Sequence, residues 1–323
     1  MEESIKEEKK DLLKPKNDVV FQCLFNQKNE KITKAFVEAI LEKKIKKMTI
    51  NETKELYREK PEDKLGILDL ELDINDKEKV DVEVELIERE NFAERLLYYF
   101  SRLYGGEIKK GKDYTESKRV LIVAIVDYEI DLTKEIEEFE TRWKIKETKN
   151  PQLVLTEDVE FIILELPKVR REYEKNKENK KAQWMMFLDD PNTREVKEIM
   201  NKNEDIKDAI ITVHEMSEDE KIRKLAELRE KAIMDEKAIR KAGYRRGMEK
   251  GLEDGKKIGI EQGIEQGMER GIKQGIKEGI KQGIEKGERK QKEEIAKKLK
   301  AMKISLNQIK EATGLSEDEI NNL

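Results

Sequence analysis

Residues 67–86 read I-L-D-L-E-L-D-I-N-D-K-E-K-V-D-V-E-V-E-L and alternate apolar and acidic side chains along most of their length. A period of two is typical of a β-strand that buries one face. We therefore expect a hairpin of two strands, connected by a loop over Asn75–Lys79. One face of this hairpin then consists of aliphatic side chains, namely Leu68, Leu70, Leu72, Ile74, Val80, Val82, Val84 and Leu86.

The other face of the hairpin consists of carboxylates. Symmetric pairing about the loop would place the acids of one strand opposite those of the other, Asp73 with Asp81, Glu71 with Glu83 and Asp69 with Glu85. Like charges that face each other across a sheet are destabilising. These acids must therefore be solvated, as one face of an antiparallel sheet often is, or be paired with Lys or Arg, or bind a cation. The third alternative would make the hairpin a metal site.

The composition divides the chain into a core-forming part and a charged part. Of the 323 residues, 44% are charged and 36% are hydrophobic, whereas typical domains are about a quarter charged and about half apolar. Nearly all aromatic and β-branched runs lie between Asp18 and Phe187. We expect one core domain followed by a helical, charge-rich region. The net charge of −5 provides no global attraction for nucleic acid, so any DNA contact must depend on local patches.

The cysteine and histidine content excludes two kinds of site. Cys23 is the single cysteine, which excludes a disulfide framework and is typical of a reducing compartment. His214 is the single histidine, so a histidine-based metal centre is excluded as well. The sequence begins M-E-E-S-I-K-E-E-K-K, which is no signal peptide, and no apolar span approaches the length of a transmembrane helix. We expect a cytoplasmic protein without membrane contact.

The order of the expected elements indicates an α/β fold. Two helices are expected before the hairpin, the first capped by Asn17 or Asp18 and the second over about 31–42. A short strand over 48–50 is expected between the second helix and the hairpin. A helix over about 91–104, stopped by Gly105 and Gly106, follows the hairpin. The runs 120–126 and 161–166 are apolar on both faces, which predicts buried strands. We expect a mixed sheet flanked by helices.

A glycine repeat dominates the C-terminal part of the chain. Glycine occupies every fourth position, at Gly243, Gly247, Gly251, Gly255, Gly259, Gly263, Gly267, Gly271, Gly275, Gly279, Gly283 and Gly287. A period of four overshoots one helical turn by about 40° and favours a right-handed supercoil. Each glycine costs about 1 kcal/mol relative to alanine, so an isolated helix is unfavourable. We expect either a stalk that makes the protein a homo-oligomer or a flexible polar linker.

Two short helices are expected at the C-terminus. Ser305 would cap the first, Thr313 and Gly314 would form the turn, and Ser316 with Glu319 would form a capping box for the second. The acidic second helix argues against insertion into DNA, so we expect a small helical hairpin. The predicted division of the chain is a frayed or disordered segment over 1–12, a core over 13–190, a helical extension over 191–242, the glycine repeat over 243–287 and the helical hairpin over 288–323.

Five ordered motifs resemble the Rpn family of recombination-promoting nucleases, which are PD-(D/E)XK family transposases. These motifs are K-P-K-N-D-V-V-F-Q-C-L-F (14–25), D-K-L-G-I-L-D (63–69), V-E-V-E-L (82–86), R-L-L-Y-Y-F-S-R-L-Y (95–104) and K-K-G-K-D-Y (109–114). The resemblance extends over about 13–166, and the glycine-rich tail is also similar to the ends of that family. It implies a bacterial protein linked to recombination or mobile elements, with a restriction-endonuclease-like core that cleaves DNA with Mg²⁺, or with Mn²⁺ as the alternative ion.

The resemblance also implies roles for individual acids. By position, Asp69 matches the family's metal-binding Asp and Glu83 matches the Glu of its E-x-Q motif. Glu85 stands where that motif has Gln, or Lys in the wider superfamily. A carboxylate at this position either adds a third metal ligand or weakens or abolishes catalysis.

The chemistry of magnesium agrees with this assignment, because Mg²⁺ prefers a few carboxylates together with water and phosphate oxygens. Asp69 and Glu83 on adjacent strands would supply the carboxylates, and Asp18 would be an outer ligand or only a helix cap. Arg95 would contact phosphate or pair with an acid of the hairpin. Glu71, Asp73 and Asp81 are expected to be outer or solvated acids.

The leading hypothesis is therefore a metal-dependent DNA endonuclease with Asp69, Glu83 and Glu85 at the catalytic site. The alternative is a catalytically inactive family member that acts as an oligomeric interaction protein.

Overall fold

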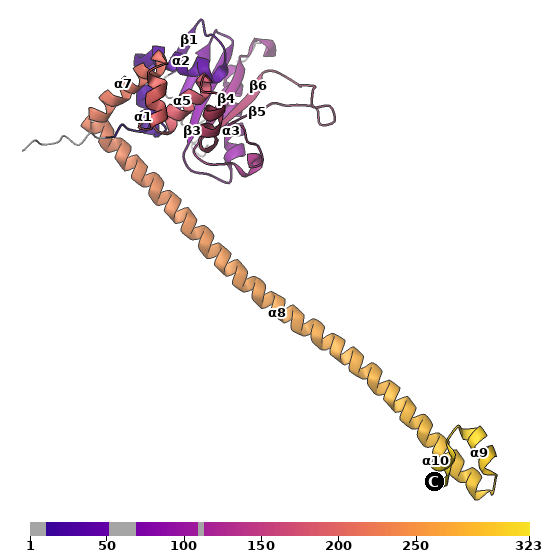
Figure 1. Ribbon diagram of the computed structural model, residues 1–323. Coiled ribbons are helices and arrows are strands. Elements are labelled where there is room, and N and C mark those ends of the chain that lie inside the picture. Colours follow the sequence, from indigo (N-terminus) through magenta and orange to yellow (C-terminus); the bar gives the residue numbers. More distant parts are fainter. Residues whose placement is uncertain (1–10, 52–68, 109–112) are drawn as a thin grey trace, which may run out of the picture. The chain divides into compact units, whose positions relative to one another are not determined.

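The computed structural model describes residues 11–51, 69–108 and 113–323 (Figure 1). It divides into two compact units, Met1–Ile239 and Arg240–Leu323. The residues Ile67 and Leu68 of the predicted hairpin lie outside the described residues. None of the described helices is both long enough and apolar enough to cross a membrane.

The first unit is built on a mixed six-stranded sheet with the order β1-β2-β3-β4-β6-β5. Its strands are β1 (Met48–Asn51), β2 (Leu70–Ile74), β3 (Glu78–Glu85), β4 (Arg119–Val126), β5 (Glu140–Trp143) and β6 (Val159–Glu165). The first three strands pair antiparallel, β3, β4 and β6 pair parallel, and β5 pairs antiparallel with β6. The expected α/β class with a mixed sheet is confirmed.

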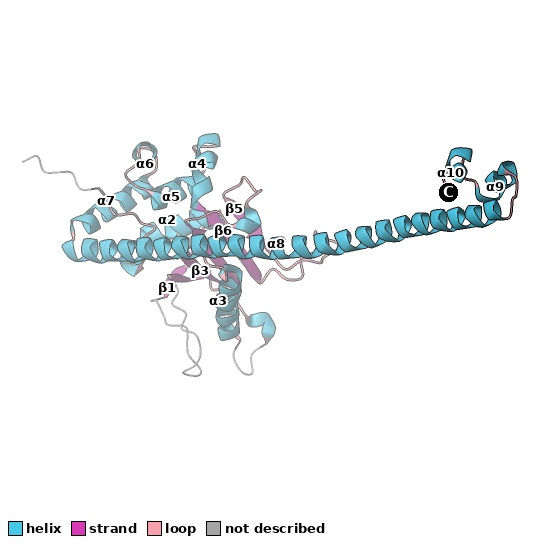
Figure 2. Ribbon diagram, turned by 90° about the horizontal axis from the view of Figure 1, so that it is seen from below, coloured by secondary structure: helices cyan, strands magenta, loops and turns pink. Residues whose placement is uncertain are grey.

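Helices cover both faces of this sheet, as Figure 2 shows. The larger core contains residues of α1 (Asp18–Leu24), α2 (Glu30–Leu41), α4 (Leu166–Lys175), α5 (Lys180–Asp189), α6 (Arg194–Met200) and α7 (Glu204–Glu218). The helix α3 (Phe92–Glu107) packs on the opposite face and forms a smaller core there. The short 3₁₀ helices are Gln27–Asn29, Tyr114–Glu116 and Asp131–Thr133. The predicted extension over 191–242 therefore contributes α6 and α7 to the same core as the sheet.

The strand β4 lies between the two cores. Leu121, Val123 and Ile125 belong to the larger core, whereas Ile122 and Ala124 belong to the core under α3. All of these side chains are buried. The prediction of a central strand that is covered on both faces is confirmed, because an unbroken apolar run satisfies two interfaces at once.

The pairing predicted for the acidic hairpin was wrong by two residues. In the structure Glu71 faces Asp81 and Asp73 faces Lys79. The turn is also tighter than expected, because Asn75 and Asp76 both adopt left-handed backbone conformations with φ of 52° and 58°. Asn and Asp tolerate this conformation better than other non-glycine residues and so permit a tight turn.

The helix α3 continues through the two glycines that were expected to stop it. It ends at Glu107, after Gly105 and Gly106. A glycine inside a helix costs only about 1 kcal/mol relative to alanine. Packing of Leu96, Tyr99 and Leu103 against the sheet outweighs that cost.

The long helix α8 (Glu220–Ala301) contains the whole glycine repeat. It is followed by α9 (Leu306–Thr313) and α10 (Glu317–Asn321), which pack with the end of α8 through a small apolar cluster that includes Ala296, Ile309 and Ile320. The expected capping box of Ser316 and Glu319 is present. Ser305 precedes α9, but its hydroxyl donates to Gln308 at 2.7 Å and does not cap the helix backbone.

The turn of the acidic hairpin supplies the first prediction. Asn75 has a left-handed backbone, and its Oδ1 accepts hydrogen bonds from the amides of Lys46 and Lys47, both at 3.0 Å. We expect Asn75→Ala to destabilise the first unit by about 2 kcal/mol, because both the backbone preference and these bonds are lost.

The matched variant Asn75→Gly keeps the backbone freedom and should lose only about 1 kcal/mol. Urea unfolding, followed by the fluorescence of the buried Trp184, measures both values. Equal losses in the two variants would contradict a role for the left-handed conformation.

Candidate metal centre in an acidic cavity

The acids of β3 point toward α3 and are buried. Asp81, Glu83 and Glu85 are only 0%, 4% and 7% exposed. Their parallel partners on β4 are Ile122, Ala124 and Val126, which lie in the core under α3. The solvated face that was one alternative for the hairpin is therefore wrong for these three acids, whereas Asp81 does not line the cavity described below. The reason is that α3 covers this face of the sheet.

The corrected register brings Asp69 and Glu83 together. The Asp69 amide donates to Glu83 Oε1 at 3.3 Å, and the Val84 amide donates to Asp69 Oδ2 at 2.8 Å. Both carboxylates are thus oriented by the backbone of the neighbouring strand.

A cavity of about 130 Å³ gathers all the predicted site residues. Its walls include the carboxylates and three arginines, namely Asp18, Asp69, Glu83, Glu85, Arg89, Arg95 and Arg229. Such a volume accommodates an ion with a few water molecules. Elements that are far apart in the sequence therefore meet at one site.

The carboxylates of this cavity repel one another. Burial raises the pKa of Asp69 to about 6, a hydrogen bond from the Val84 amide partly opposes this rise, and the charges of Asp18 and Glu85 add to it. Burial, with the charges of Asp81 and Asp69, raises the pKa of Glu83 well above its ordinary value. Near neutral pH, a bound cation would offset this repulsion.

Asp81 lies deepest in this acidic group. Burial raises the pKa of Asp81 as well, with further contributions from Asp69 and Glu71. Neither of its carboxylate oxygens has a hydrogen-bond partner among the described residues. A buried carboxylate without partners is costly, so Asp81 adds to the excess of negative charge.

The other end of the acidic face is neutralised by basic residues. Lys79 Nζ lies 2.7 Å from Glu71 Oε1 and 3.6 Å from Asp73 Oδ1. Lys118 Nζ lies 2.5 Å from Asp73 Oδ1. Although burial opposes it, hydrogen bonds from Lys118 and Asn51 hold the pKa of Asp73 below its ordinary value. Glu71 and Asp73 are therefore ion-paired outside the cavity described above, and of the two expectations, outer or solvated, the solvated one is wrong.

Glu85 is paired with an arginine from α3. Arg95 Nη1 lies 2.8 Å from Glu85 Oε1, and Arg95 Nη2 donates to the Tyr99 hydroxyl at 2.8 Å. Burial raises the pKa of Glu85, against the opposing effect of Arg95 and Arg89. Of the two roles expected for Arg95, the structure has the ion pair with an acid.

Asp18 lies at the start of α1 and pairs with α8. Its Oδ2 accepts a hydrogen bond from Arg229 Nε at 2.6 Å, while the N-cap of the helix is Asn17. No sequence pattern indicated Arg229 or Arg89 as residues of this site. Nothing in the local pattern around Arg229 connects it with a hairpin about 150 residues earlier in the chain, and only the docking of α8 does so.

The donor set fits a hard divalent ion that keeps water ligands. Within 11–51, 69–108 and 113–323, no three acidic, cysteine or histidine side chains converge to hold a metal on their own. Mg²⁺ commonly binds through one or two carboxylates and completes its shell with water and substrate phosphates. Asp69 and Glu83 correspond to such a partial shell.

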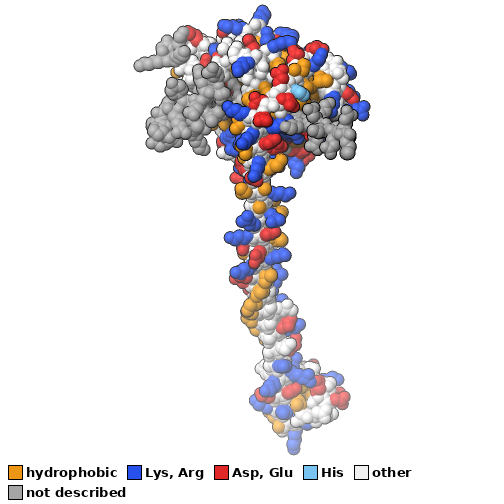
Figure 3. All heavy atoms as spheres, turned by 90° about the vertical axis from the view of Figure 1, so that its left-hand side faces the viewer, with side chains coloured by type: hydrophobic (Ala, Val, Ile, Leu, Met, Phe, Trp, Pro, Cys, Tyr) orange, Lys and Arg blue, Asp and Glu red, His pale blue; other side chains and the backbone are white. Residues whose placement is uncertain are grey.

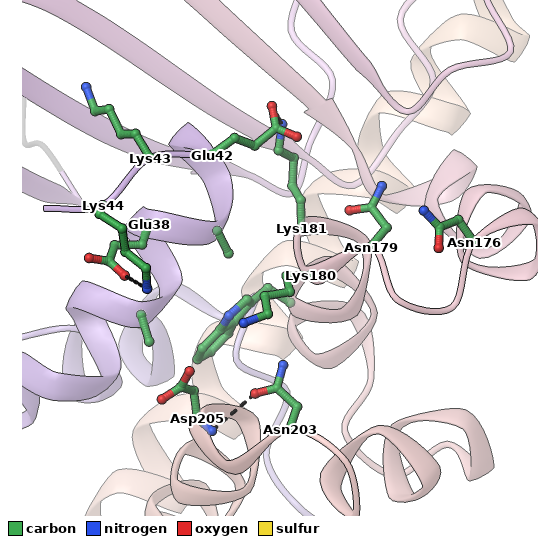
Figure 4. A pocket seen from close by; sticks show the side chains of 13 residues that line it. Glu38, Glu42, Lys43, Lys44, Asn176, Asn179, Lys180, Lys181, Asn203 and Asp205 are labelled. Atoms are coloured by element: carbon green, nitrogen blue, oxygen red, sulfur yellow. Dashed lines mark hydrogen bonds and ion pairs between the residues drawn. The ribbon is translucent and has the colours of Figure 1, made fainter.

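A larger cavity, of about 450 Å³, lies beside α2 and α5 and has different chemistry (Figure 4). Its charged side chains are largely paired with one another, because Lys44 lies 2.9 Å from Glu38 and Lys181 lies 3.1 Å from Glu42. It contains none of the predicted site residues. The acidic cavity is therefore the better candidate for catalysis despite its smaller size.

Residues 15–243 match the model of the PD-(D/E)XK nuclease family transposase. The chain belongs to this family. No curated protein and no solved structure matched the chain.

The match covers the sheet, the acidic cavity and Arg229, and ends at the first glycine of the repeat. The PD-(D/E)XK nucleases act on DNA and, in this branch, are related to mobile elements. The name of the family specifies a lysine two residues after the second acid, and two residues after Glu83 this chain has Glu85.

The repulsion in the cavity predicts how neutral substitutions affect stability. Since the pKa of Asp69 is raised to about 6 in the folded chain, the metal-free protein loses stability as the pH rises from about 4 to about 6. At pH 7 we expect Asp69→Asn to stabilise the metal-free chain by about 1–3 kcal/mol. The change should also abolish any stabilisation by added Mg²⁺.

Asp73→Asn, four residues later in β2, is the matched control. It removes an ion-paired acid whose pKa is lowered, so it should destabilise the chain by about 1 kcal/mol and leave the effect of Mg²⁺ intact. Urea unfolding at pH 7, with and without Mg²⁺, gives all four values. A loss of stability in Asp69→Asn would show that the acid is already compensated in the metal-free chain.

Proposed function

We propose that the protein is a DNA endonuclease that hydrolyses phosphodiester bonds with Mg²⁺, or Mn²⁺, held by Asp69 and Glu83. The observation that carries the proposal is the juxtaposition of the buried Glu83 of β3 with Asp69, which is half-buried and directly precedes β2, at a cavity with an excess of negative charge. Membership of the PD-(D/E)XK nuclease family transposases supports the reaction and a role in recombination or mobile elements.

The residues of the chain have separate tasks in this proposal. A bound Mg²⁺ would polarise the phosphate and lower the pKa of the attacking water. The amides of Val84 and Asp69 hold the two ligands in place. Arg89 lines the same cavity and would attract the phosphate, whereas Arg95 is paired with Glu85. Asp18 is a weaker third candidate, because binding a metal would require it to exchange its partner Arg229.

Glu85 determines how active such a site is. Its pairing with Arg95 draws the guanidinium toward a carboxylate and away from a phosphate. Glu85 therefore acts against catalysis in this proposal, and its contribution as a third ligand would require the ion pair to break. The alternative function, an inactive interaction protein, follows if this inhibition is complete.

Plasmid cleavage tests the nuclease proposal directly. We expect nicking with Mg²⁺ and none with EDTA, and we expect Asp69→Ala and Glu83→Ala each to lower the rate at least about 100-fold, or about 2.7 kcal/mol. Asp73→Ala serves as the control, because Asp73 lies outside the cavity. Nicking that is independent of metal, or that persists in both variants, would reject the proposal.

The variant Glu85→Gln tests the altered position. Removal of one negative charge beside the scissile phosphate should raise the nicking rate about tenfold, which corresponds to about 1.4 kcal/mol. Glutamine also keeps the size of the side chain and can still accept a hydrogen bond from Arg95. A fall in rate as large as that of Asp69→Ala would instead identify Glu85 as a metal ligand.

We also propose that the protein is a homo-oligomer assembled through its C-terminal region. The exposed apolar residues of the repeat in α8 support this proposal.

A further inference from the structure

The first turns of α8 form one wall of the acidic cavity. Arg229 and Ile233 of this helix line the cavity together with the acids. Arg229 Nε lies 2.6 Å from Asp18 Oδ2, and Glu236 Oε1 lies 3.9 Å from Arg89 Nη2. The helix therefore contacts two charged groups of the proposed site, an acid that could bind the metal and an arginine that would attract the phosphate.

These two contacts have the same charges as the ligands that the site would bind. The guanidinium of Arg229 places a cation beside Asp18, as a bound metal would. The carboxylate of Glu236 places an anion beside Arg89, as a phosphate of DNA would. The helix α8 thus competes with the metal and with DNA for groups of the same cavity.

The cavity is small while α8 is in this position. Its volume is about 130 Å³, which holds an ion with a few water molecules. Pockets that enclose a drug-sized ligand have about 300–1,000 Å³, and a nucleotide with its sugar and base is of that size. A nucleotide that is to reach Asp69 and Glu83 therefore requires one wall of the cavity to move.

The wall formed by α8 is only weakly attached. Within Glu220–Ile239, all of which the structure describes, two side chains are buried, those of Ala226 and Ile233. Figure 3 shows charged side chains, with apolar ones between them, along α8. The ion pairs of Arg229 and Glu236 are partly exposed, and such pairs contribute little to stability. By contrast, α1 has its buried side chains in the larger core.

A joint for such a movement lies directly before α8. The preceding helix α7 ends at Glu218 and α8 begins at Glu220, and Asp219 between them has an extended backbone. Hinges are commonly a few residues at the ends of elements. Ala226 lies nearer to this joint than Ile233 and Glu236 do, so a rotation at Asp219 would displace the residues at the cavity the most.

We propose that the segment Glu220–Ile239 of α8 is a gate that closes the acidic cavity and is displaced when metal and DNA bind. The proposal rests on the proposed nuclease function and adds how that site is regulated. In the closed position Arg229 and Glu236 hold Asp18 and Arg89. Because DNA binds only the open state, closure of the gate lowers the apparent affinity for DNA by the fraction of chains that are open.

The reactivity of a thiol in the gate tests the proposal without reference to cleavage. The full-length chain with Cys23→Ser, which removes the single native thiol, receives Ile233→Cys. Ile233 is 7% exposed, whereas the next residue, Met234, is 60% exposed, so Met234→Cys is the matched control. With Mg²⁺ and a short DNA duplex we expect a maleimide to modify Ile233→Cys about tenfold faster than in the free chain. Met234→Cys should react fast under both conditions.

Removal of the two ion pairs is a second test. Arg229→Gln together with Glu236→Gln should raise the reactivity of Ile233→Cys about fivefold in the absence of DNA, because the closed state loses both contacts. The double change leaves the net charge of the chain the same, so it does not alter the general attraction to DNA. Asp235→Asn removes the exposed acid beside Glu236 and should leave the rate unchanged. An unchanged rate in the double variant would overturn the role of the two ion pairs.

Fluorescence anisotropy of the labelled duplex, in the same samples, separates this proposal from the nuclease proposal. DNA that binds while Ile233→Cys reacts as slowly as in the free chain would reject the gate and leave the nuclease proposal intact. DNA that binds the double variant more tightly than the native chain would support the gate. If neither chain binds or nicks DNA, the nuclease proposal fails and the gate fails with it.

Discussion

Burial of carboxylates on β3 is the constraint on which the first unit depends. The strand is central in the sheet, and α3 covers the face that carries Asp81, Glu83 and Glu85. Charges in such a position must be compensated locally. Lys79 provides this at one end of the face through its pairs with neighbouring acids. At the other end Asp69 and Glu83 have raised pKa values, so that end is destabilised until protons or a cation offset the charge.

This imbalance connects the fold with the proposed chemistry. Functional sites often contain buried charges that destabilise the fold, and proteins compensate for them elsewhere. The acids around Asp69 and Glu83 follow this pattern, because they would destabilise the metal-free chain and would be stabilised by a bound ion. The two ends of one acidic face provide an internal comparison. Asp73 is held by cations and has a lowered pKa, whereas Asp69, which lies four residues earlier and directly precedes β2, has a raised one.

The helix α8 takes part in both proposed activities of the protein. Its first turns contribute Arg229 and Ile233 to the wall of the acidic cavity, and its later turns carry the glycine repeat. Twelve glycines in one helix cost about 12 kcal/mol relative to alanine, and within the described chain no neighbouring atom lies within 4 Å of the place where a Cβ of any of them would be. Burial of the apolar stripe against a second helix would supply the missing stabilisation, at about 1.5–3 kcal/mol for each large side chain that is fully buried.

The sequence by itself determined most elements of the fold and pointed to the two acids at the centre of the proposed site. Its period of two along the hairpin, its unbroken apolar strand Val120–Val126 and the capping box at Ser316 are local patterns, and local sterics and hydrogen bonding are sufficient to produce them. The register of the acidic hairpin became evident only in the structure, where Asn75 and Asp76 adopt left-handed conformations that shorten the loop. The tertiary structure alone decided which acids are paired with cations. These cations come from other segments, such as Arg95 of α3 and Arg229 of α8. A local sequence pattern contains no information on the distance between segments that meet only in the folded chain.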